Sequence, residues 1–196
     1  MEILLKSIIF ASLIIFAVLF VFSLVIFAVH HKTGGALFVP TPKVMIQEIV
    51  RSIDFSRFQD IRELGTGDGR FISAVEKSYK RAVLGYEINP IAFFITWLKI
   101  RLYGLNSRVK FTSFWEQDLR GAHCVFCYLF PDIMARLGEK LDCELEQGAY
   151  VISANFTIPG WREEKIVQVS RSIFNDPIYV YRIGNHKGDS SHPDVR

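Results

Sequence analysis

Three glycines at alternate positions, followed one predicted strand later by an acidic residue, constrain this chain more than any other feature. The glycines lie in Glu63-Leu64-Gly65-Thr66-Gly67-Asp68-Gly69-Arg70. An apolar, extended stretch over 58–64 precedes them, and a helical pattern from Phe71 to Tyr79 follows. Glycines let the backbone turn tightly and approach a ligand closely, and the start of a helix presents free N–H groups to it. The order of strand, glycine turn and helix therefore predicts a pocket for a nucleotide-type cofactor.

The acidic residue is Glu87, in Gly85-Tyr86-Glu87-Ile88-Asn89-Pro90, which is 18 residues beyond Gly69. That spacing fits one helix and one strand, so the carboxylate reaches the tip of the next parallel strand, where it can accept the hydroxyls of a ribose. A dinucleotide fingerprint needs a small residue at position 70, so Arg70 weakens the NAD alternative. A glycine-rich turn that only reverses the chain is the other alternative.

Residues 3–29 form an apolar segment with Lys6 as the only charged residue. A helix of that length would extend about 40 Å, more than the roughly 30 Å of hydrocarbon in a bilayer. The segment therefore predicts a tilted transmembrane helix. The alternative is a secretory signal, but its apolar core would be only about 7–15 residues long. The excess of Lys and Arg after the segment favours the cytoplasmic side for the rest of the chain.

Charge and cysteine content argue against two other classes of site. The net charge is +3, and the chain has no basic run that would suit a nucleic-acid groove. Its three cysteines give no disulfide framework. Cys124 and Cys127 have the spacing of a metal motif, but residues three apart on a strand face opposite sides, and no second pair exists. We expect neither a nucleic-acid partner nor a bound metal.

The remaining pattern predicts an α/β fold with a doubly wound, mostly parallel sheet of seven strands. Strands are expected over 61–64, 82–87, 108–113, 123–129, 149–155, 164–171 and 177–183. Helices are expected from Pro42, with Thr41 as N-cap, and over 70–79, 90–103 and 131–147. No helix separates the last two strands, which predicts an antiparallel hairpin. The predicted division is an anchor over 1–32, a domain over 33–184 and a disordered tail over 185–196.

The helix expected over 91–103 is apolar on more than one face. The stripe expected in the core comprises Ile91, Phe94, Ile95, Leu98 and Leu102. A second face comprises Phe93, Trp97 and Ile100. Because Lys99 and Arg101 flank this second face, we expect it to rest on the membrane or on a membrane-embedded substrate. Packing against the N-terminal helices is the alternative.

These features resemble class I S-adenosylmethionine-dependent methyltransferases, and in particular the small membrane-anchored enzymes of the FAM173 type. The resemblance is carried by the apolar segment, Val39-Pro40-Thr41-Pro42, the glycine run and Tyr128-Leu129-Phe130-Pro131, and it covers the chain except for its tail. It implies a Rossmann-like methyltransferase domain with S-adenosylmethionine as cofactor. It also implies that the acceptor is a lysine of a membrane protein, such as the adenine nucleotide translocase or the c subunit of the ATP synthase.

The resemblance implies roles for individual residues. Glu63 would lie near the methionine amino group, Glu87 would bind the ribose, and Ser113 would lie near the adenine, where the family tends to carry Asp. The implied cofactor-binding set is Thr41, Glu63, Gly65, Gly67, Asp68, Gly69, Glu87, Asn89, Ser113 and Phe114.

Tyr128 and Pro131 are the candidate catalytic residues, because they follow the fourth strand, at the edge where ligands bind in this architecture. Tyr128 would orient the amine, or alternatively pack against the cofactor or core. The 128–131 segment has no side-chain amide, unlike the corresponding segment of methyltransferases that act on nucleic-acid bases or on glutamine. Acceptors of those two kinds are therefore not expected. A lipid or small hydrophobic acceptor, and a nucleotide-binding membrane scaffold without turnover, are the alternative functions.

Overall fold

The computed structural model describes residues 6, 10, 12–17, 19–21, 39–169 and 176–187. The chain divides into two units, Met1–Leu37 and Phe38–Arg196, and each is described by itself. In the first unit, the described residues are helical and exposed. Most of the predicted membrane segment over 3–29 lies outside the described residues. Among those that are described, no helix has both the length and the apolar character needed to cross a bilayer.

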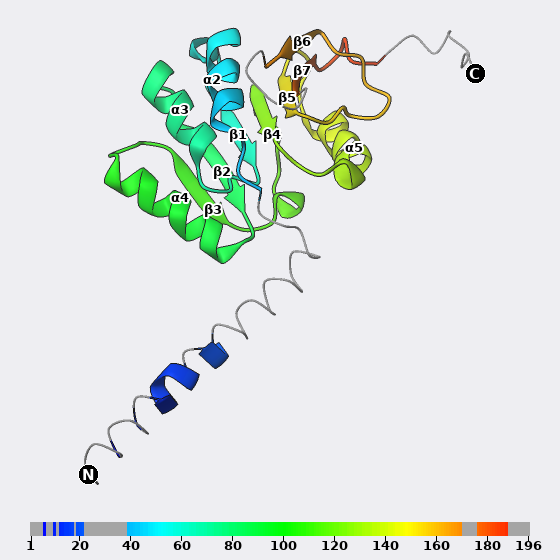
Figure 1. Ribbon diagram of the computed structural model, residues 1–196. Coiled ribbons are helices and arrows are strands. Elements are labelled where there is room, and N and C mark those ends of the chain that lie inside the picture. The colour runs from blue at the N-terminus through cyan, green and yellow to red at the C-terminus, as the bar shows by residue number, and fades with distance from the viewer. Residues whose placement is uncertain are drawn as a thin grey trace. The chain divides into compact units, whose positions relative to one another are not determined.

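The second unit is built on a sheet with the strand order β3-β2-β1-β4-β5-β7-β6 (Figure 1). The strands are β1 Ile61–Leu64, β2 Val83–Glu87, β3 Arg108–Phe111, β4 Cys124–Cys127, β5 Tyr150–Ala154, β6 Lys165–Gln168 and β7 Pro177–Arg182. Strands β1 to β5 pair in parallel, and β7 pairs antiparallel with both β5 and β6. The predicted seven-stranded, mostly parallel sheet with an antiparallel hairpin is confirmed for the described residues.

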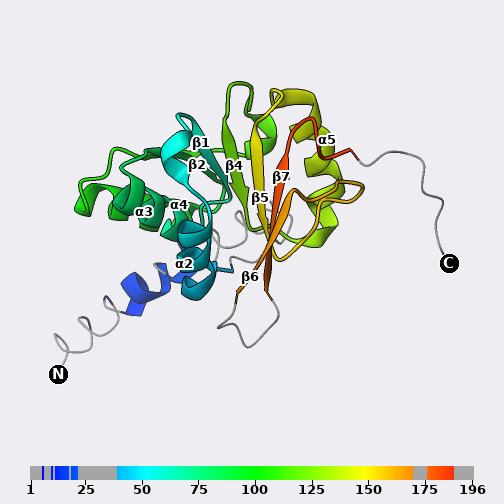
Figure 2. The same ribbon diagram turned by 90° about the horizontal axis from the view of Figure 1, so that it is seen from above.

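Helices cover both faces of this sheet (Figure 2). They are α2 Lys43–Ser52, α3 Arg70–Tyr79, α4 Pro90–Leu102 and α5 Met134–Glu144, with short 3₁₀ helices at Phe55–Arg57, Phe114–Glu116 and Pro131–Ile133. One apolar cluster joins α2 and α3 to one face of the sheet and includes a stacked pair, Phe71 and Phe126, with ring centroids 4.1 Å apart. A second cluster joins α5 to the other face. Cys124 and Cys127 are buried in different clusters, so they face opposite sides as expected.

Two helix starts differ from the expectation. Helix α2 begins at Lys43 with Pro42 in the N-cap position, and Thr41 supplies no side-chain cap. Helix α5 begins at Met134 rather than at position 131, because Pro131–Ile133 forms a separate 3₁₀ turn. Such tight turns are common at helix ends, where the first N–H groups lack intrahelical partners.

Helix α4 is turned differently from the prediction. Its buried residues are Ala92, Thr96 and Ile100. The stripe that was expected in the core is instead exposed, by between 36% and 73%: Ile91, Phe94, Ile95, Leu98 and Leu102. The buried side of the helix packs on the glycine turn, where a Cβ at Gly69 would lie 2.8 Å from Cγ2 of Thr96. Thr96 therefore faces this turn, and the large apolar side chains are exposed.

The ordered structure extends slightly beyond the expected domain boundary at residue 184. His186 is buried, and its Nε2 lies 3.0 Å from Oδ1 of Asp142 on α5. Gly184 donates its backbone N–H to Nδ1 of the same ring, and Lys187 forms a β-bridge with Trp161. Residues 185–187, which were predicted to belong to the tail, are therefore part of the domain. The rest of the predicted tail, 188–196, lies outside the described residues.

Candidate active site

A small cavity lies at the carboxyl ends of β1 and β4. Its lining includes six of the predicted site residues: Thr41, Glu63, Gly65, Gly67, Asp68 and Tyr128. Its volume is about 20 Å³, which is room for about one water molecule. The wall at Thr41 is held by a hydrogen bond of 2.9 Å from Nη1 of Arg70 to the Thr41 carbonyl.

The glycine turn forms one wall of this cavity. Gly65, Gly67 and Gly69 all have left-handed backbones, with φ values of 76°, 54° and 71°. The backbone N–H groups of Gly65 and Thr66 both donate to the carbonyl of Tyr86, at 2.9 and 3.2 Å. Because Tyr86 belongs to β2, the turn is fixed against the neighbouring strand.

Two close approaches hold the turn in place. Thr96 on α4 donates from Oγ1 to the carbonyl of Gly67 at 2.8 Å and packs against Gly69. On the other side, a Cβ at Gly85 would lie only 2.1 Å from Cγ2 of Thr66. Glycine is therefore required at 85, on β2, for a packing reason. Sequence reasoning missed Thr96 and Gly85, because neither approach follows from spacing along the chain.

Glu63 lines this cavity and is buried, at 3% exposure. Within the part of the chain that the structure describes, its Oε2 has no hydrogen-bond partner. Desolvation raises the pKa of this carboxyl well above its ordinary value, and the nearby charges of Glu87 and Asp68 raise it further. A hydrogen bond with the Ile72 backbone offsets only part of this rise in pKa. A carboxylate is costly to bury without a charged partner, so the site suits a cationic group beside Glu63. The methionine ammonium of S-adenosylmethionine fits that requirement.

Glu87 is buried at the tip of β2, where its carboxylate binds three backbone N–H groups. Oε2 accepts from Gly67 at 2.8 Å, and Oε1 accepts from Ile88 and Asn89 at 2.9 and 2.8 Å. Burial raises the pKa of Glu87, and these three hydrogen bonds partly offset the rise. A carboxylate has about four acceptor positions, so part of its capacity is still available to a ribose.

The remaining predicted cofactor residues lie beside this tip but outside the cavity lining. Asn89 caps α4, and its Oδ1 accepts from Ile91 and Ala92 at 3.0 and 3.2 Å. Ser113 accepts the N–H of Trp115 at 3.3 Å in the following 3₁₀ turn, which also contains the half-buried Phe114. The backbone N–H of Thr112 donates to the Glu87 carbonyl at 3.0 Å, so this loop lies next to the acid.

A charged cluster supports Asp68 in the turn. Its Oδ2 accepts from Nε of Arg70 at 2.9 Å and from Nζ of Lys99 at 3.1 Å. Lys99 also donates to the Asp68 carbonyl at 2.5 Å. The two cations hold the carboxylate while Arg70 faces the cavity. Sequence reasoning placed Lys99 beside the membrane face, whereas it joins α4 to the glycine turn.

The carboxyl ends of β4 and β5 supply a second group of polar residues. Tyr128 is half-buried, and burial raises its pKa, with a further contribution from the charge of Asp176. An interaction with the Asn155 side chain offsets part of this rise in pKa. Asn155, directly after β5, has a left-handed backbone with φ of 69°, and its N–H donates to the Pro177 carbonyl at 2.8 Å. Its Oδ1 is buried and has no hydrogen-bond partner among the described residues. Pro131 lies in the exposed 3₁₀ turn after Tyr128.

Asn155 and Asp176 were not predicted as site residues. A positive φ at a residue other than glycine is uncommon and often marks a functional position. The only sequence signal was the Asn175-Asp176-Pro177 turn, which sequence reasoning assigned to a hairpin. Asp176 is nevertheless buried, at the start of β7.

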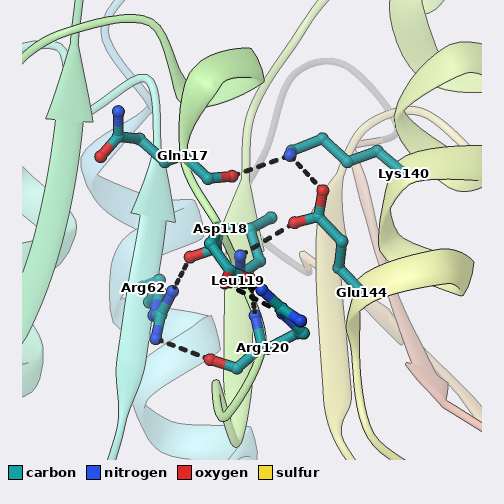
Figure 3. Close-up of polar contacts among 7 residues, drawn as sticks. All are labelled: Arg62, Gln117, Asp118, Leu119, Arg120, Lys140 and Glu144. Carbon is teal, nitrogen blue, oxygen red and sulfur yellow. Dashed lines mark hydrogen bonds and ion pairs between the residues drawn. The ribbon is translucent and has the colours of Figure 1, made fainter.

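A separate polar network lies between β1, the 117–120 segment and α5 (Figure 3). Arg62 donates to the carbonyls of Asp118 and Arg120, and Lys140 donates to the carbonyl of Gln117 at 2.8 Å. Glu144 accepts from Leu119 and from Lys140. Because these charged groups bind one another and the backbone, the network is structural. It contains none of the predicted site residues. Among the described residues, no three His, Cys, Asp or Glu side chains gather as a metal ion would require.

The fold is similar to those of several solved methyltransferases. An RNA methyltransferase from Salinibacter ruber, in complex with S-adenosyl-L-homocysteine, is 22% identical, with a TM-score of 0.67 that covers 80% of this chain and 100% of that one. A ribosomal protein L11 methylase from Lactobacillus delbrueckii subsp. bulgaricus is 15% identical, with a TM-score of 0.58 over 72% of this chain and 77% of that one. At these identities the likeness shows the fold alone.

Sequence comparison is more specific. A protein-lysine N-methyltransferase from Saccharolobus islandicus is 32% identical over 154 residues, which are 76% of this chain and 95% of that protein. The adenine nucleotide translocase lysine N-methyltransferase of Mus musculus is 34% identical over 54% of this chain and 47% of its own length.

The family described as "ANTKMT methyltransferase domain" matches residues 63–165, just over half of the chain. The match begins at Glu63 and includes the glycine turn, Glu87 and Tyr128. The predicted enzyme class and cofactor are confirmed by this match together with the relatives. This chain belongs to the ANTKMT methyltransferase domain family and is an S-adenosylmethionine-dependent methyltransferase.

Proposed function

We propose that this enzyme transfers a methyl group to a lysine amine of a membrane-associated protein. The observation that carries the proposal is that a single cavity joins the buried carboxyl of Glu63 to the phenol of Tyr128. The first suits the cationic end of the donor, and the second lies on the side from which an acceptor would enter. The relatives named as lysine N-methyltransferases support this acceptor class.

The donor supplies an electrophilic methyl group, and the chain has to hold it in line with the amine. Glu63 would pair with the methionine ammonium, and the Arg70 guanidinium, which faces the same cavity, would pair with the methionine carboxylate. Glu87 would accept the ribose hydroxyls with its remaining acceptor capacity. Asn89, Ser113 and Phe114 would lie along the adenosine half.

The acceptor side needs little acid–base machinery. A lysine amine has an ordinary pKa near 10.4 and reacts only when it is neutral, which an apolar environment favours. Phe130 and Pro131 would form the apolar mouth, and the negative charge of Asp176 would attract the ammonium form. The unpaired Oδ1 of Asn155 would then accept an N–H of the neutral amine, beside the Tyr128 side chain with which Asn155 interacts.

The proposed membrane attachment rests on the sequence. Residues 3–29 would cross the bilayer once, as part of an anchor over 1–32, and the catalytic domain that follows would lie on the cytoplasmic side. The basic residues that follow the apolar segment support this orientation. A protein substrate in the same membrane would then be held near the active site.

The test uses the full chain in native membranes with methyl-labelled S-adenosylmethionine. Label recovered as methyl-lysine after hydrolysis of the protein fraction is the expected result. Label in the lipid fraction would instead identify a lipid acceptor. Donor binding is measured in parallel by calorimetry for the natural chain and for Glu87→Ala. Absence of binding by the natural chain would favour a scaffold without turnover.

A further inference from the structure

The outward side of α4 carries large apolar side chains that the fold leaves uncovered. Ile91, Phe94, Ile95, Leu98 and Leu102 follow one another at spacings of one, three and four residues, so their side chains adjoin on the helix surface. Trp97 stacks on Phe94, with centroids 5.8 Å apart. We call these six residues the α4 face. In Figure 1, α4 lies on the outer side of the domain, next to β3 at the sheet edge.

The side chains around the α4 face carry positive charge. From residue 88 to residue 115 the chain has no Asp or Glu, and its charged residues are Lys99, Arg101, Arg108 and Lys110. Lys99 is bound to Asp68, whereas the other three are exposed: Arg101 on α4, and Arg108 and Lys110 on β3. The Arg101 guanidinium lies 5.8 Å from the Trp97 ring centroid.

The cationic rim continues at the end of the helix. From α3, Nζ of Lys77 lies 3.7 Å from the ring centroid of the exposed Tyr103. On β3, the exposed Phe111 lies next to Lys110 and packs against Phe93, with ring centroids 5.3 Å apart. Aromatic rings beside Lys and Arg are the pattern of elements that lie at a membrane surface.

We propose that the α4 face binds the surface of an anionic lipid bilayer, as a second membrane contact besides residues 3–29. Single exposed apolar residues are normal, but a helix side composed of them marks an interaction surface. Its apolar centre suits the acyl boundary, and its cationic rim suits anionic headgroups.

The position of α4 connects this contact to catalysis, a step that rests on the proposed function. The helix begins at Pro90, directly after Glu87 and Asn89 at the carboxyl end of β2. The active-site cavity opens at the same edge of the sheet. A domain resting on α4 would therefore keep its substrate edge near the bilayer, where lysines of membrane proteins emerge.

The test places the full chain in lipid nanodiscs of phosphatidylcholine, with or without phosphatidylserine. A polarity-sensitive fluorophore is attached to the cysteine of a Leu98→Cys variant. The exposed Cys143 is replaced by Ser so that it does not react, whereas Cys124 and Cys127 are buried and can stay. Ile166→Cys, on the distant edge strand β6 and exposed by 50%, is the matched control. The expected result is a blue shift and quenching by brominated lipid at position 98, strengthened by phosphatidylserine, with no change at position 166.

Charge reversal at the cationic rim provides a second test, read with the same label at position 98. Arg101→Glu with Arg108→Glu should abolish the effect of phosphatidylserine at position 98, whereas Arg51→Glu on α2 should not. A blue shift at position 98 without quenching by brominated lipid would mean that another part of the chain, or a second copy, covers the face, and this would overturn the proposal. Equal responses at 98 and 166 would do the same. Because these readouts need no turnover, they are independent of whether the acceptor is a lysine.

Discussion

The carboxylate of Glu87 accepts the backbone N–H of Gly67 at 2.8 Å, across 20 residues of sequence. This bond joins the tip of β2 to the glycine turn that follows β1. Besides its proposed role in binding the ribose, Glu87 therefore holds the turn in the conformation that lines the cavity. Donor binding and the shape of the turn depend on the same side chain.

Replacing Glu87 with Ala should weaken donor binding about 10- to 100-fold, because hydrogen bonds to a charged group contribute about 1.5–3 kcal/mol each. Calorimetry with S-adenosylmethionine measures the effect. Glu144→Ala is the matched control, since Glu144 also accepts a backbone N–H, from Leu119, but lies in the network of Figure 3. The control should lose stability without losing donor affinity. Equal losses of affinity in both variants would contradict the assigned role.

Gly85→Ala should destabilise the domain by about 1–3 kcal/mol, as expected for overpacking. The new Cβ would lie 2.1 Å from Cγ2 of Thr66. Thr66→Ser removes that methyl group, so the double variant should regain part of the loss. Urea unfolding of the two single variants and the double variant gives the coupling energy. Strictly additive effects would show that the contact is not the cause.

Glu63→Gln should make the donor-free protein more stable at neutral pH. The pKa of Glu63 is raised on folding from its ordinary value of 4.5, so the folded state retains a proton that the unfolded chain has lost. The contribution of Glu63 to the free energy of unfolding is fully present below pH 4.5 and is lost as pH rises through the folded pKa. The loss is about 1.4 kcal/mol for each pH unit between the unfolded and the folded pKa.

Urea unfolding of both proteins at pH 4.5 and pH 8 tests this difference. The variant should gain over the natural chain only at the higher pH, and it should bind the donor more weakly because it cannot pair with the ammonium. An unchanged difference between the two pH values would mean that Glu63 does not titrate as described.

Asn155→Gly should raise stability and lower turnover. Glycine adopts a φ of 69° readily, which relieves a cost of up to about 1 kcal/mol, and the variant has no buried, unpaired Oδ1. If that oxygen orients the acceptor amine, kcat should fall while donor affinity is unchanged. Thermal unfolding, calorimetry and methyl transfer separate the three quantities.

Tyr128→Phe is the companion variant at the same edge. It keeps the ring, so a fall in kcat would assign the effect to the hydroxyl, and unchanged kcat would indicate packing alone. Unchanged turnover in both Asn155→Gly and Tyr128→Phe would place the amine elsewhere on the carboxyl edge.

Features that depend on local conformation could be predicted from the sequence. Left-handed backbones at alternate positions need glycine, so the glycine pattern alone predicts the turn. Apolar periodicity located the strands and helices, and α3 begins and ends at the predicted residues. Glu63 and Tyr128 line one cavity, because neighbouring parallel strands end at one edge of a sheet.

The features that could not be predicted depend on contacts between distant segments. The amino-acid sequence by itself determined the order of the strands along the chain, the glycine turn and the two acids, because each follows from backbone freedom or from a period of two or 3.6 residues. Only the tertiary structure decided which side of α4 is buried, because that side is set by the contact of Thr96 with the glycine turn, which lies 29 residues away from it along the chain. It also decided the strained backbone of Asn155, which neighbouring strands hold in place.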